Sequence, residues 1–305
     1  MKRLGVVGSM VWDRIYDRDP AQHVAEEWGG ISYSLAGLDA TLPRDWQIVP
    51  LIKVGADLAG RANEFFRTII HVAPGSRFIL VPEPNNRVTL HYTEAARRSE
   101  QMSGGVPAWT WPELGPMVQD LDAVYVNFIS GYEMDLVTAQ YLRRGFAKIL
   151  YADLHSLFLG KADDGTRIPQ PLANAPSWFS CFDYVQVNED ELAQLGPDPL
   201  RVAATMLAGG TKALIVTRGA QGVEYFTGSP VRAARIPAQR SAEPDERLDP
   251  TGCGDVFGAT VVASLLGGAS LDAALETGVQ FAARNLTHRG ATGLRDHLLG
   301  RLARV

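Results

Sequence analysis

Cysteine is scarce in this chain, which has two among its 305 residues, Cys181 and Cys253. Two cysteines are too few for a disulfide framework or for a zinc site built from cysteine ligands, and they favour a reducing, cytoplasmic setting. Long apolar runs are missing as well, because no stretch approaches the ~18 apolar residues of a membrane-spanning helix. We therefore expect a protein without disulfide bonds and without a membrane segment.

Charge of one sign is not in excess either. Lys and Arg number 29 and Asp and Glu number 34, which gives a formal net charge of −5. A chain with this balance lacks the basic character that binding to a phosphate backbone requires, so we expect no nucleic-acid partner. With 46% hydrophobic and 21% charged residues, the composition is globular and excludes a disordered, collagen-like or coiled-coil chain.

Short apolar runs alternate with longer amphipathic segments. The runs lie at 4–7, 47–52, 123–126, 148–151, 184–187 and 213–216. Runs that are apolar on both faces suit strands buried between helices. The alternation therefore predicts an α/β fold that is doubly wound, with a mostly parallel central sheet flanked by helices. Helices are expected over 57–70, 134–146 and 189–195, and along most of the chain after residue 252.

Two stretches interrupt this alternation. Residues 13–29 are highly charged, and residues 83–104 contain an alternating pattern at 87–93 that is typical of a half-exposed strand. We expect both to form a small β lid over one end of the main sheet. No linker or internal repeat divides the chain, so the prediction is one α/β domain over residues 1–305, with lid segments at about 13–29 and 83–104.

The sharpest local signal is the segment 248–258, which leads directly into an apolar helix. Gly252, Cys253 and Gly254 are small enough to let backbone N–H groups approach an anion, and the helix that follows adds the positive end of its dipole. Asp255 lies beside this turn, where a carboxylate can take a proton from an alcohol while the amides neutralise a phosphoryl group. Asp255 is therefore the candidate general base.

This segment resembles the D-T-x-G-A-G-D motif of the ribokinase (PfkB) family of carbohydrate and nucleoside kinases. The resemblance implies a ribokinase-like fold, with Asp255 as catalytic base and residues 252–254 as the anion hole. It also implies a kinase that transfers the γ-phosphoryl group of ATP, with Mg²⁺, to a hydroxyl of a sugar or nucleoside. Two positions depart from the motif, since Pro250 stands where Thr is usual and Cys253 replaces Ala. An accessible Cys253 would make activity sensitive to thiol oxidation.

Further segments match the same family in the same order along the chain. Asp13 follows the first strand, where the family's Asp binds sugar hydroxyls. Gly29 and Gly30 resemble the turn at which the backbone meets the substrate, and Ser34 stands where many members have Asn. The resemblance therefore assigns these four residues to the acceptor.

The resemblance also implies sites for metal ions. Asn188 and Glu191 resemble the N-x-x-E motif and are expected to organise hydrated Mg²⁺, which binds proteins through few oxygen ligands. Asp249 is expected to bind a monovalent cation such as K⁺ together with carbonyl groups of 290–292. Taken alone, Asn188 and Glu191 are also what an ordinary acidic helix start looks like.

The nucleotide side of the resemblance lies later in the chain. Thr217, Gly219 and Gly222 match the T-x-G-x-x-G nucleotide loop, in which glycine leaves room for phosphates. Asn285 and the loop 287–293 are expected on the adenine side.

Two other regions carry weaker expectations. Asp57, in a stretch that resembles the family's V-G-x-D-x-x-G, is expected as a helix N-cap. Residues 151–156 stand where many sugar kinases have D-x-N-x-R, and Asp153 remains while His155 and Ser156 replace later polar positions. No arginine clamp is expected at this place, which disfavours phosphorylated acceptors.

Two other functions stay open. A related fold phosphorylates vitamin precursors, and a non-catalytic relative could act as a sensor for a sugar or nucleotide. The lid and the pattern at 188–191 favour the sugar and nucleoside branch, and Asp255 with Glu191 count against a pure binder. By resemblance, a homodimer could form through the lid, with the strand at 87–93 as a pairing edge.

Overall fold

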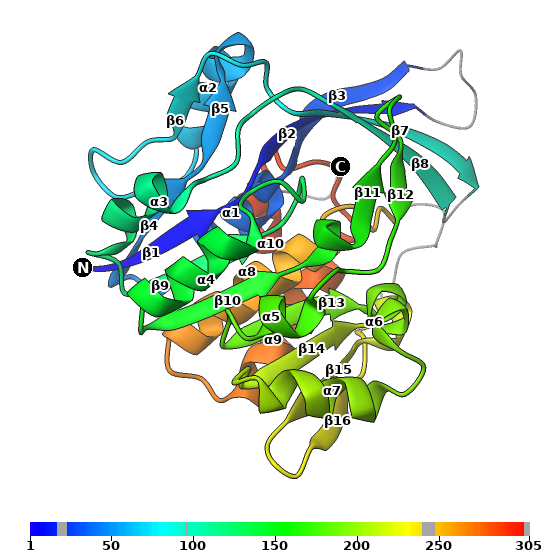
Figure 1. The fold of residues 1–305 in the computed structure, drawn as a ribbon. Coiled ribbons are helices and arrows are strands. Elements are labelled where there is room, and N and C mark those ends of the chain that lie inside the picture. Colours follow the sequence, from blue (N-terminus) through cyan, green and yellow to red (C-terminus); the bar gives the residue numbers. More distant parts are fainter. Residues whose placement is uncertain (17–22, 95–96, 240–247, 302–305) are drawn as a thin grey trace.

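The computed structural model describes residues 1–16, 23–94, 97–239 and 248–301 (Figure 1). Its main sheet has eight strands in the order β16-β15-β14-β13-β10-β9-β1-β4. Strands from β14 to β4 are parallel, whereas β15 and β16 are antiparallel to their neighbours. The bounds are β1 (Lys2–Val7), β4 (Trp46–Leu51), β9 (Ala123–Asn127), β10 (Ile149–Asp153), β13 (Tyr184–Asn188), β14 (Ala213–Thr217), β15 (Val223–Thr227) and β16 (Arg232–Ile236).

Helices cover both faces of this sheet and enclose two apolar cores. Within β1, Leu4 and Val6 face one core and Val7 faces the other, as the alternation of side chains along a strand requires. The first core contains α1 (Ile31–Thr41), α2 (Ala59–Phe66), α8 (Cys253–Leu266), α9 (Leu271–Asn285) and α10 (Leu294–Leu298). The second contains α3 (Trp111–Val118), α4 (Leu136–Gly145), α5 (Ala175–Phe179), α6 (Glu189–Leu195) and α7 (Pro199–Ala208).

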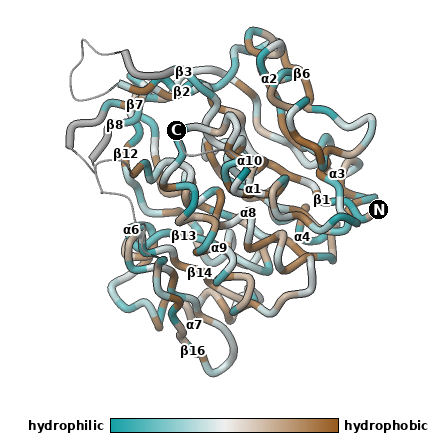
Figure 2. The backbone as a smooth tube through the Cα atoms, turned by 180° about the vertical axis from the view of Figure 1, so that it is seen from behind, coloured by the Kyte–Doolittle hydropathy of each residue, from teal (hydrophilic) through white to brown (hydrophobic). Residues whose placement is uncertain are grey.

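Hydrophobic residues concentrate on the strands and inner helix faces between these layers (Figure 2). The predicted fold class, a doubly wound and mostly parallel sheet flanked by helices with a second small sheet, is confirmed. None of the helices in the described ranges is long and apolar enough to cross a membrane.

The second sheet, called here the small sheet, has the order β3-β2-β7-β8. Its strands are β2 (Met10–Tyr16), β3 (His23–Gly30), β7 (Arg87–Glu94) and β8 (Arg97–Ser103). The expectation that 87–93 offers a pairing edge is wrong, because β7 is hydrogen-bonded to β2 on one side and to β8 on the other. Alternation of polar and apolar residues shows that one face of a strand is exposed. It does not show whether a hydrogen-bonding edge of the strand is exposed.

Short elements complete the fold. They are β5 (Lys53–Gly55), β6 (Ile79–Val81), the hairpin of β11 (Leu159–Lys161) and β12 (Arg167–Pro169), and the 3₁₀ turns η1 (Ala56–Leu58), η2 (His155–Phe158) and η3 (Gly219–Gln221). Asp57 lies inside η1 and is not a helix N-cap. Its carboxylate accepts a hydrogen bond from the Asn85 N–H at 2.8 Å and pairs with Arg87, so it connects η1 to the approach to β7.

The parallel strands set out two edges with different chemistry. Their carboxyl ends bring Asn127, Asp153, Asn188 and Thr217 to the same edge of the sheet. At the opposite edge, Asp183 precedes β13 and its carboxylate accepts the Leu150 N–H at 2.8 Å. Ligands of open parallel sheets bind outside the carboxyl ends of the strands, so the polar groups at this edge form the candidate site.

Asp183 gives a test of the fold that does not touch the site. Its carboxylate also pairs with Arg143 and Lys212, each at 3.1 Å. Asp183→Ala leaves the Leu150 N–H without this acceptor, and an unsatisfied buried group costs about 1–3 kcal/mol of unfolding free energy. The matched control is Glu64→Ala on the exposed side of α2, where a change of about 0.5 kcal/mol or less is expected. Urea unfolding measures both, and equal midpoints would contradict the role of Asp183.

Candidate active site

The anion-binding turn is Gly252–Gly254 at the start of α8. Gly252 has φ 75°, and an added Cβ there would overlap the ring of Tyr33, so both the backbone angle and the space require glycine. The chain enters α8 at Cys253, and Gly254 is exposed. The Cys253 N–H donates to the Pro250 carbonyl at 3.1 Å, and the exposed Gly254 follows it in the first turn of a 14-residue helix, whose positive dipole end favours an anion.

Asp255 lies in the first turn of α8 and is held by side chains from the main sheet. Asn127, the last residue of β9, donates its Nδ2 hydrogen to the Asp255 Oδ1 at 2.7 Å. The same Nδ2 lies 3.1 Å from the Ser34 Oγ and 3.2 Å from the Tyr125 hydroxyl. Because Asn127 is fully buried, this network fixes one oxygen of the half-exposed Asp255.

Gln186 of β13 connects the turn to a buried acid. Its Nε2 donates to the Gly254 carbonyl at 3.0 Å and to the Asp153 Oδ2 at 2.6 Å. Its Oε1 accepts the Tyr151 hydroxyl at 2.8 Å. An added Cβ at Gly258 would press on the Gln186 amide, so a glycine in α8 makes room for this link.

Acidic side chains crowd the site on the side of β10 and β13. Burial, together with the charge of Glu191, raises the pKa of Asp153 to about 8. Burial alone would lower the pKa of His155, but the charge of Glu191 and its hydrogen bond to Nδ1 at 2.6 Å outweigh this and raise it to about 9. Near neutral pH the site therefore holds an imidazolium paired with a carboxylate.

Glu191 and Asn188 form a capping box at the start of α6. The Asn188 Oδ1 accepts the Glu191 N–H at 2.9 Å, and the Glu191 Oε2 accepts the Asn188 N–H at 2.7 Å. The motif thus has the local role of a helix cap, and it also places a buried carboxylate at the carboxyl edge of the sheet.

The residues at this edge fit magnesium only as an ion held largely by water and phosphate. Within the described ranges, no group of three or more acidic, histidine or cysteine side chains is arranged to hold a metal ion directly. The charges of Glu191 and Asp255 nevertheless both act on Asp153, which shows a local excess of negative charge. Mg²⁺ usually keeps several waters and needs few protein oxygens, so this arrangement suits it.

The loop after β14 has the shape expected for close approach to a ligand. Gly219 and Gly222 have φ angles of 49° and 94°, and an added Cβ at Gly222 would overlap the Ile236 carbonyl. The Arg218 N–H donates to the Gly222 carbonyl at 2.8 Å and closes the loop. Thr217 is the last residue of β14, with its hydroxyl 3.5 Å from the Val187 carbonyl.

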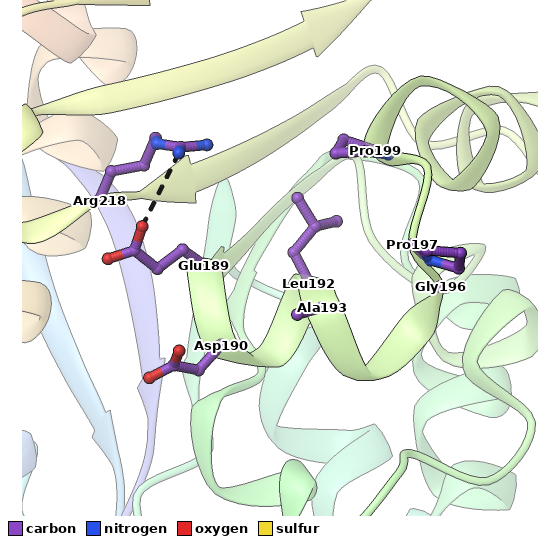
Figure 3. Close-up of a pocket in the computed structure, with 8 residues that line it drawn as sticks. All are labelled: Glu189, Asp190, Leu192, Ala193, Gly196, Pro197, Pro199 and Arg218. Carbon is purple, nitrogen blue, oxygen red and sulfur yellow. Dashed lines mark ion pairs between the residues drawn. The ribbon is translucent and has the colours of Figure 1, made fainter.

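A surface pocket of about 300 Å³ adjoins this loop between α6 and α7 (Figure 3). Glu189 and Asp190 line it, and the Glu189 carboxylate faces Arg218 at 3.8 Å. The pocket has two acidic side chains and one arginine, and Arg218 is already paired with Glu189 and Glu224. The pocket is therefore a poor site for a phosphate chain. We therefore place the candidate active site at the open turn around Asp255 and not in this pocket.

Asn285 and Asp249 hold the candidate anion-binding turn by hydrogen bonds to Thr251, the residue that precedes it. The Asn285 Nδ2 donates to the Thr251 carbonyl at 2.9 Å, and the Asp249 Oδ1 accepts the Thr251 N–H at 2.9 Å. Asn285 is fully buried, so its contacts are with the turn itself. That Asn285 lies on the adenine side of a bound nucleotide stays a prediction.

Asp249 has an acidic neighbour, Glu27, that was not expected from the sequence. Burial raises the pKa of Glu27, and the charges of Asp249 and Arg289 also act on it. An added Cβ at Gly290 would overlap the Glu27 carboxylate, whose Oε1 is buried without a hydrogen-bond partner among the described residues. A buried, unsatisfied carboxylate oxygen beside a second carboxylate fits a small cation.

Asp13 lies on the small sheet against the turn that begins α1. It is 7% exposed, and an added Cβ at Gly29 would overlap its carboxylate. Gly30 has φ 58° and caps α1. Burial raises the pKa of the Tyr33 hydroxyl, and the charges of nearby carboxylates, Asp13 and Asp255 among them, act in the same direction. Tyr33 thus lies close enough to both Asp13 and Asp255 to feel their charges.

Ser34, expected from sequence at the acceptor, lies against Asp255. It is fully buried, and its Oγ lies near Asn127, Tyr125 and the Asp255 carbonyl, so its contacts are with the network that holds Asp255. Asn127, Gln186 and Glu27 were not predicted. The sequence signal that could have pointed to Asn127 is its position at the end of an apolar run, where a polar residue reaches the carboxyl edge of the sheet.

Comparison with protein families finds a match in the second half of the chain. Residues 161–297, a little under half of the chain, match the family model of the pfkB family carbohydrate kinases. No curated protein matches the chain at a significant level.

Solved structures match over nearly the whole chain. A ribokinase from Thermotoga maritima has a TM-score of 0.75 at 18% identity, with 99% of each chain covered. A nucleoside kinase from Burkholderia thailandensis in complex with inosine has a TM-score of 0.73 at 17% identity, covering 98% of this chain and 96% of its own. A putative ribokinase II from E. coli in complex with ATP and Mg²⁺ has a TM-score of 0.73 at 17% identity, covering 99% and 100%. The chain thus has the ribokinase fold over nearly its whole length, and its residues 161–297 are similar to the pfkB family of carbohydrate kinases.

Proposed function

We propose that the protein transfers the γ-phosphoryl group of ATP to a hydroxyl group of a sugar or nucleoside. The observation that carries this proposal is the juxtaposition of Asp255 with the open, glycine-rich turn at the start of α8. A base and an anion-binding helix terminus on adjacent residues are what in-line phosphoryl transfer to an alcohol needs. The family match over 161–297 and the ribokinase fold support the same reaction class.

Asp255 acts as the general base in this proposal. As the acceptor oxygen bonds to the γ-phosphorus, its proton passes to the Asp255 carboxylate and the bond from phosphorus to the ADP oxygen breaks. The N–H groups of the turn and the dipole of α8 stabilise the charge on the transferring group. Asn127 holds one carboxylate oxygen at 2.7 Å and so fixes the orientation of the carboxylate that would accept the proton.

The nucleotide would bind along Thr217, Gly219 and Gly222, with Asn188 and Glu191 toward its phosphates. Mg²⁺, when bound, neutralises phosphate charge and orients the phosphate chain. Solved relatives in complex with ATP and Mg²⁺ support this donor. His155 neutralises Glu191, so the capping box keeps its geometry when phosphate charge approaches.

The acceptor would lie between Asp13 and Asp255. Asp13 is a buried carboxylate, a group that accepts hydrogen bonds from hydroxyl groups, which suits a polyol. Gly29 and Gly30 have no side chains, so an acceptor can approach the backbone beside Asp13 closely. The small sheet would cover the acceptor and exclude water that would otherwise hydrolyse ATP.

Replacing the base tests the proposal directly. Asp255→Asn keeps the hydrogen bond from Asn127 sterically possible but removes proton acceptance, so kcat should fall by ~10² to 10⁴ while the fold is kept. The matched control is Asp163→Asn, an exposed acid in the β11–β12 turn, which should retain full activity. ADP release with Mg²⁺-ATP over a panel of ribose, fructose, 2-keto-3-deoxygluconate, adenosine, inosine and cytidine provides the assay. Full activity of the Asp255 variant would remove Asp255 from this role.

The thiol of Cys253 in the turn should be unreactive. Burial raises its pKa to about 12, and its Sγ lies against the Ala282 carbonyl at 3.5 Å and the Asn285 Nδ2 at 3.3 Å. The thiolate is the reactive form, so labelling with iodoacetamide at pH 7.5 should be slow in the native protein and complete after denaturation. Mass spectrometry of Cys253 with parallel activity measurements checks this. Rapid native labelling with loss of activity would contradict it.

We also propose a monovalent cation at Glu27 and Asp249. The Glu27 carboxylate lies against Gly290, the Asp249 Oδ2 lies 3.7 Å from the Arg289 Nε, and a bound cation would stabilise the turn that Asp249 supports. Activity in KCl should exceed activity in tetramethylammonium chloride at equal ionic strength, and Glu27→Gln should reduce the difference. Equal rates in potassium, sodium, ammonium and tetramethylammonium salts would refute this site.

A further inference from the structure

Arg167, the first residue of β12, is a buried cation outside the site described so far. It is 9% exposed. Its Nη2 donates to the Ser156 carbonyl at 3.2 Å, its Nη1 contacts the Met102 Sδ at 3.7 Å, and its Cζ lies 5.9 Å from the centre of the Tyr132 ring. The guanidinium is thus enclosed by η2, the loop after β9 and the small sheet, three parts of the fold that also border the acceptor side.

Arg167 has a hydrogen-bond partner in the Tyr132 side chain, and the charges of Tyr132, Glu100 and Glu133 act on its guanidinium. Glu133 is engaged elsewhere, since its Oε1 accepts from the Ser9 Oγ and the Ser130 N–H, each at 2.7 Å. A guanidinium has five N–H donors, and a carbonyl, a thioether and a phenol ring use few of them. Burial accordingly lowers the pKa of Arg167.

The register of the small sheet places Arg167 on the same face as the acceptor acid. Asp13 is directly opposite Val88 on β7, and Val88 is directly opposite Met102 on β8. Side chains that are directly opposite on neighbouring strands point to the same face, so Asp13 and Met102 share the inner face of the sheet. Two strand spacings of about 4.8 Å separate them, roughly 10 Å in all. The Arg167 Nη1 contacts the Met102 Sδ, so the guanidinium lies on this face, two strands away from Asp13.

The hairpin fixes Arg167 in that position. The Met102 N–H donates to the Gly165 carbonyl at 2.8 Å, and Gln101 forms an isolated bridge with Thr166. Figure 1 shows the β11–β12 hairpin standing beside β8. An added Cβ at Gly131 would overlap the Ser156 carbonyl oxygen, the same oxygen that accepts from the Arg167 Nη2, so a glycine in the loop after β9 lets this carbonyl keep its place.

We propose that Arg167 binds a negatively charged group, a carboxylate or a phosphate, at the end of the acceptor farther from Asp13. The inference rests on the proposed kinase function and narrows its acceptor to a sugar acid or a sugar phosphate. The planar fork of arginine matches both anions. The arginine clamp that the sequence does not show after Asp153 is thus supplied from a hairpin that follows it. With one hydroxyl group near Asp13 and its anionic group at Arg167, the acceptor would lie along the inner face of the small sheet.

Matched acceptors with and without a negative charge test the inference. ADP release is measured with fructose, ribose and inosine as neutral acceptors, and with 2-keto-3-deoxygluconate and fructose 6-phosphate as the two kinds of anion. The wild type should prefer one anionic acceptor by a factor of ~10 or more in kcat/KM. Arg167→Gln should raise KM for that acceptor by ~10- to 100-fold, the range of a charge-assisted hydrogen bond, and leave KM for ATP unchanged. Arg167→Lys should recover part of the loss.

The control variant is Lys161→Gln, which removes an exposed cation from the same hairpin and should change neither selectivity nor KM. Circular dichroism verifies that each variant is folded, and the preference of the wild type is informative even if Arg167→Gln fails to fold. Turnover of neutral acceptors alone, unaffected by Arg167→Gln, would overturn the inference and leave the kinase function intact.

Direct binding separates the two proposals if no acceptor is turned over. Titration calorimetry with 2-keto-3-deoxygluconate and with fructose 6-phosphate is then carried out on the wild type and on Arg167→Gln. Binding of either anion that is lost in the variant supports the anion site while the kinase function fails. Absence of binding in the wild type, or equal affinities in both proteins, overturns the anion site.

Discussion

The candidate site depends on one constraint, the left-handed backbone of Gly252 against the ring of Tyr33. This conformation lets the chain turn sharply into α8, so that the positive end of the helix dipole and Asp255 occupy the same helical turn. Any side chain at position 252 would have to displace Tyr33, which is itself buried between the small sheet and α8. The chemistry at Asp255 is therefore inseparable from the packing of α1 against α8.

The second organising feature is the control of negative charge at the carboxyl edge of the sheet. Asp153, Glu191 and Asp255 lie close enough to affect one another, and His155 compensates for one of these charges. Asp153 receives hydrogen bonds from the His155 N–H and from Gln186, so its oxygens are engaged whether or not it carries a proton. The negative charge that remains faces the open turn, where a nucleotide with its metal ion would enter.

The fold class and the centre of the site could be predicted from sequence because their signals are local. Buried strands show as short apolar runs, and the turn at 252–254 needs small residues at consecutive positions. Asn127 and Asp255 are far apart in the chain and meet only because β9 ends beside α8. Arg167 gives no local signal in an exposed-looking hairpin, and its burial follows from contact with β8. The pairing of β7 on both edges likewise depends on chain segments that are distant in sequence.

The contact between the β11–β12 hairpin and β8 affects how the small sheet can move. At one side of the small sheet, β2 follows β1 of the main sheet and β3 leads into α1. At the other side, the hairpin holds the outermost strand through the Met102 N–H and the Gln101 bridge to Thr166. A rigid body anchored along two opposite sides cannot rotate about one hinge while both anchors hold. Opening must either break these backbone hydrogen bonds or carry the hairpin along, so the hairpin and the small sheet form one mechanical unit.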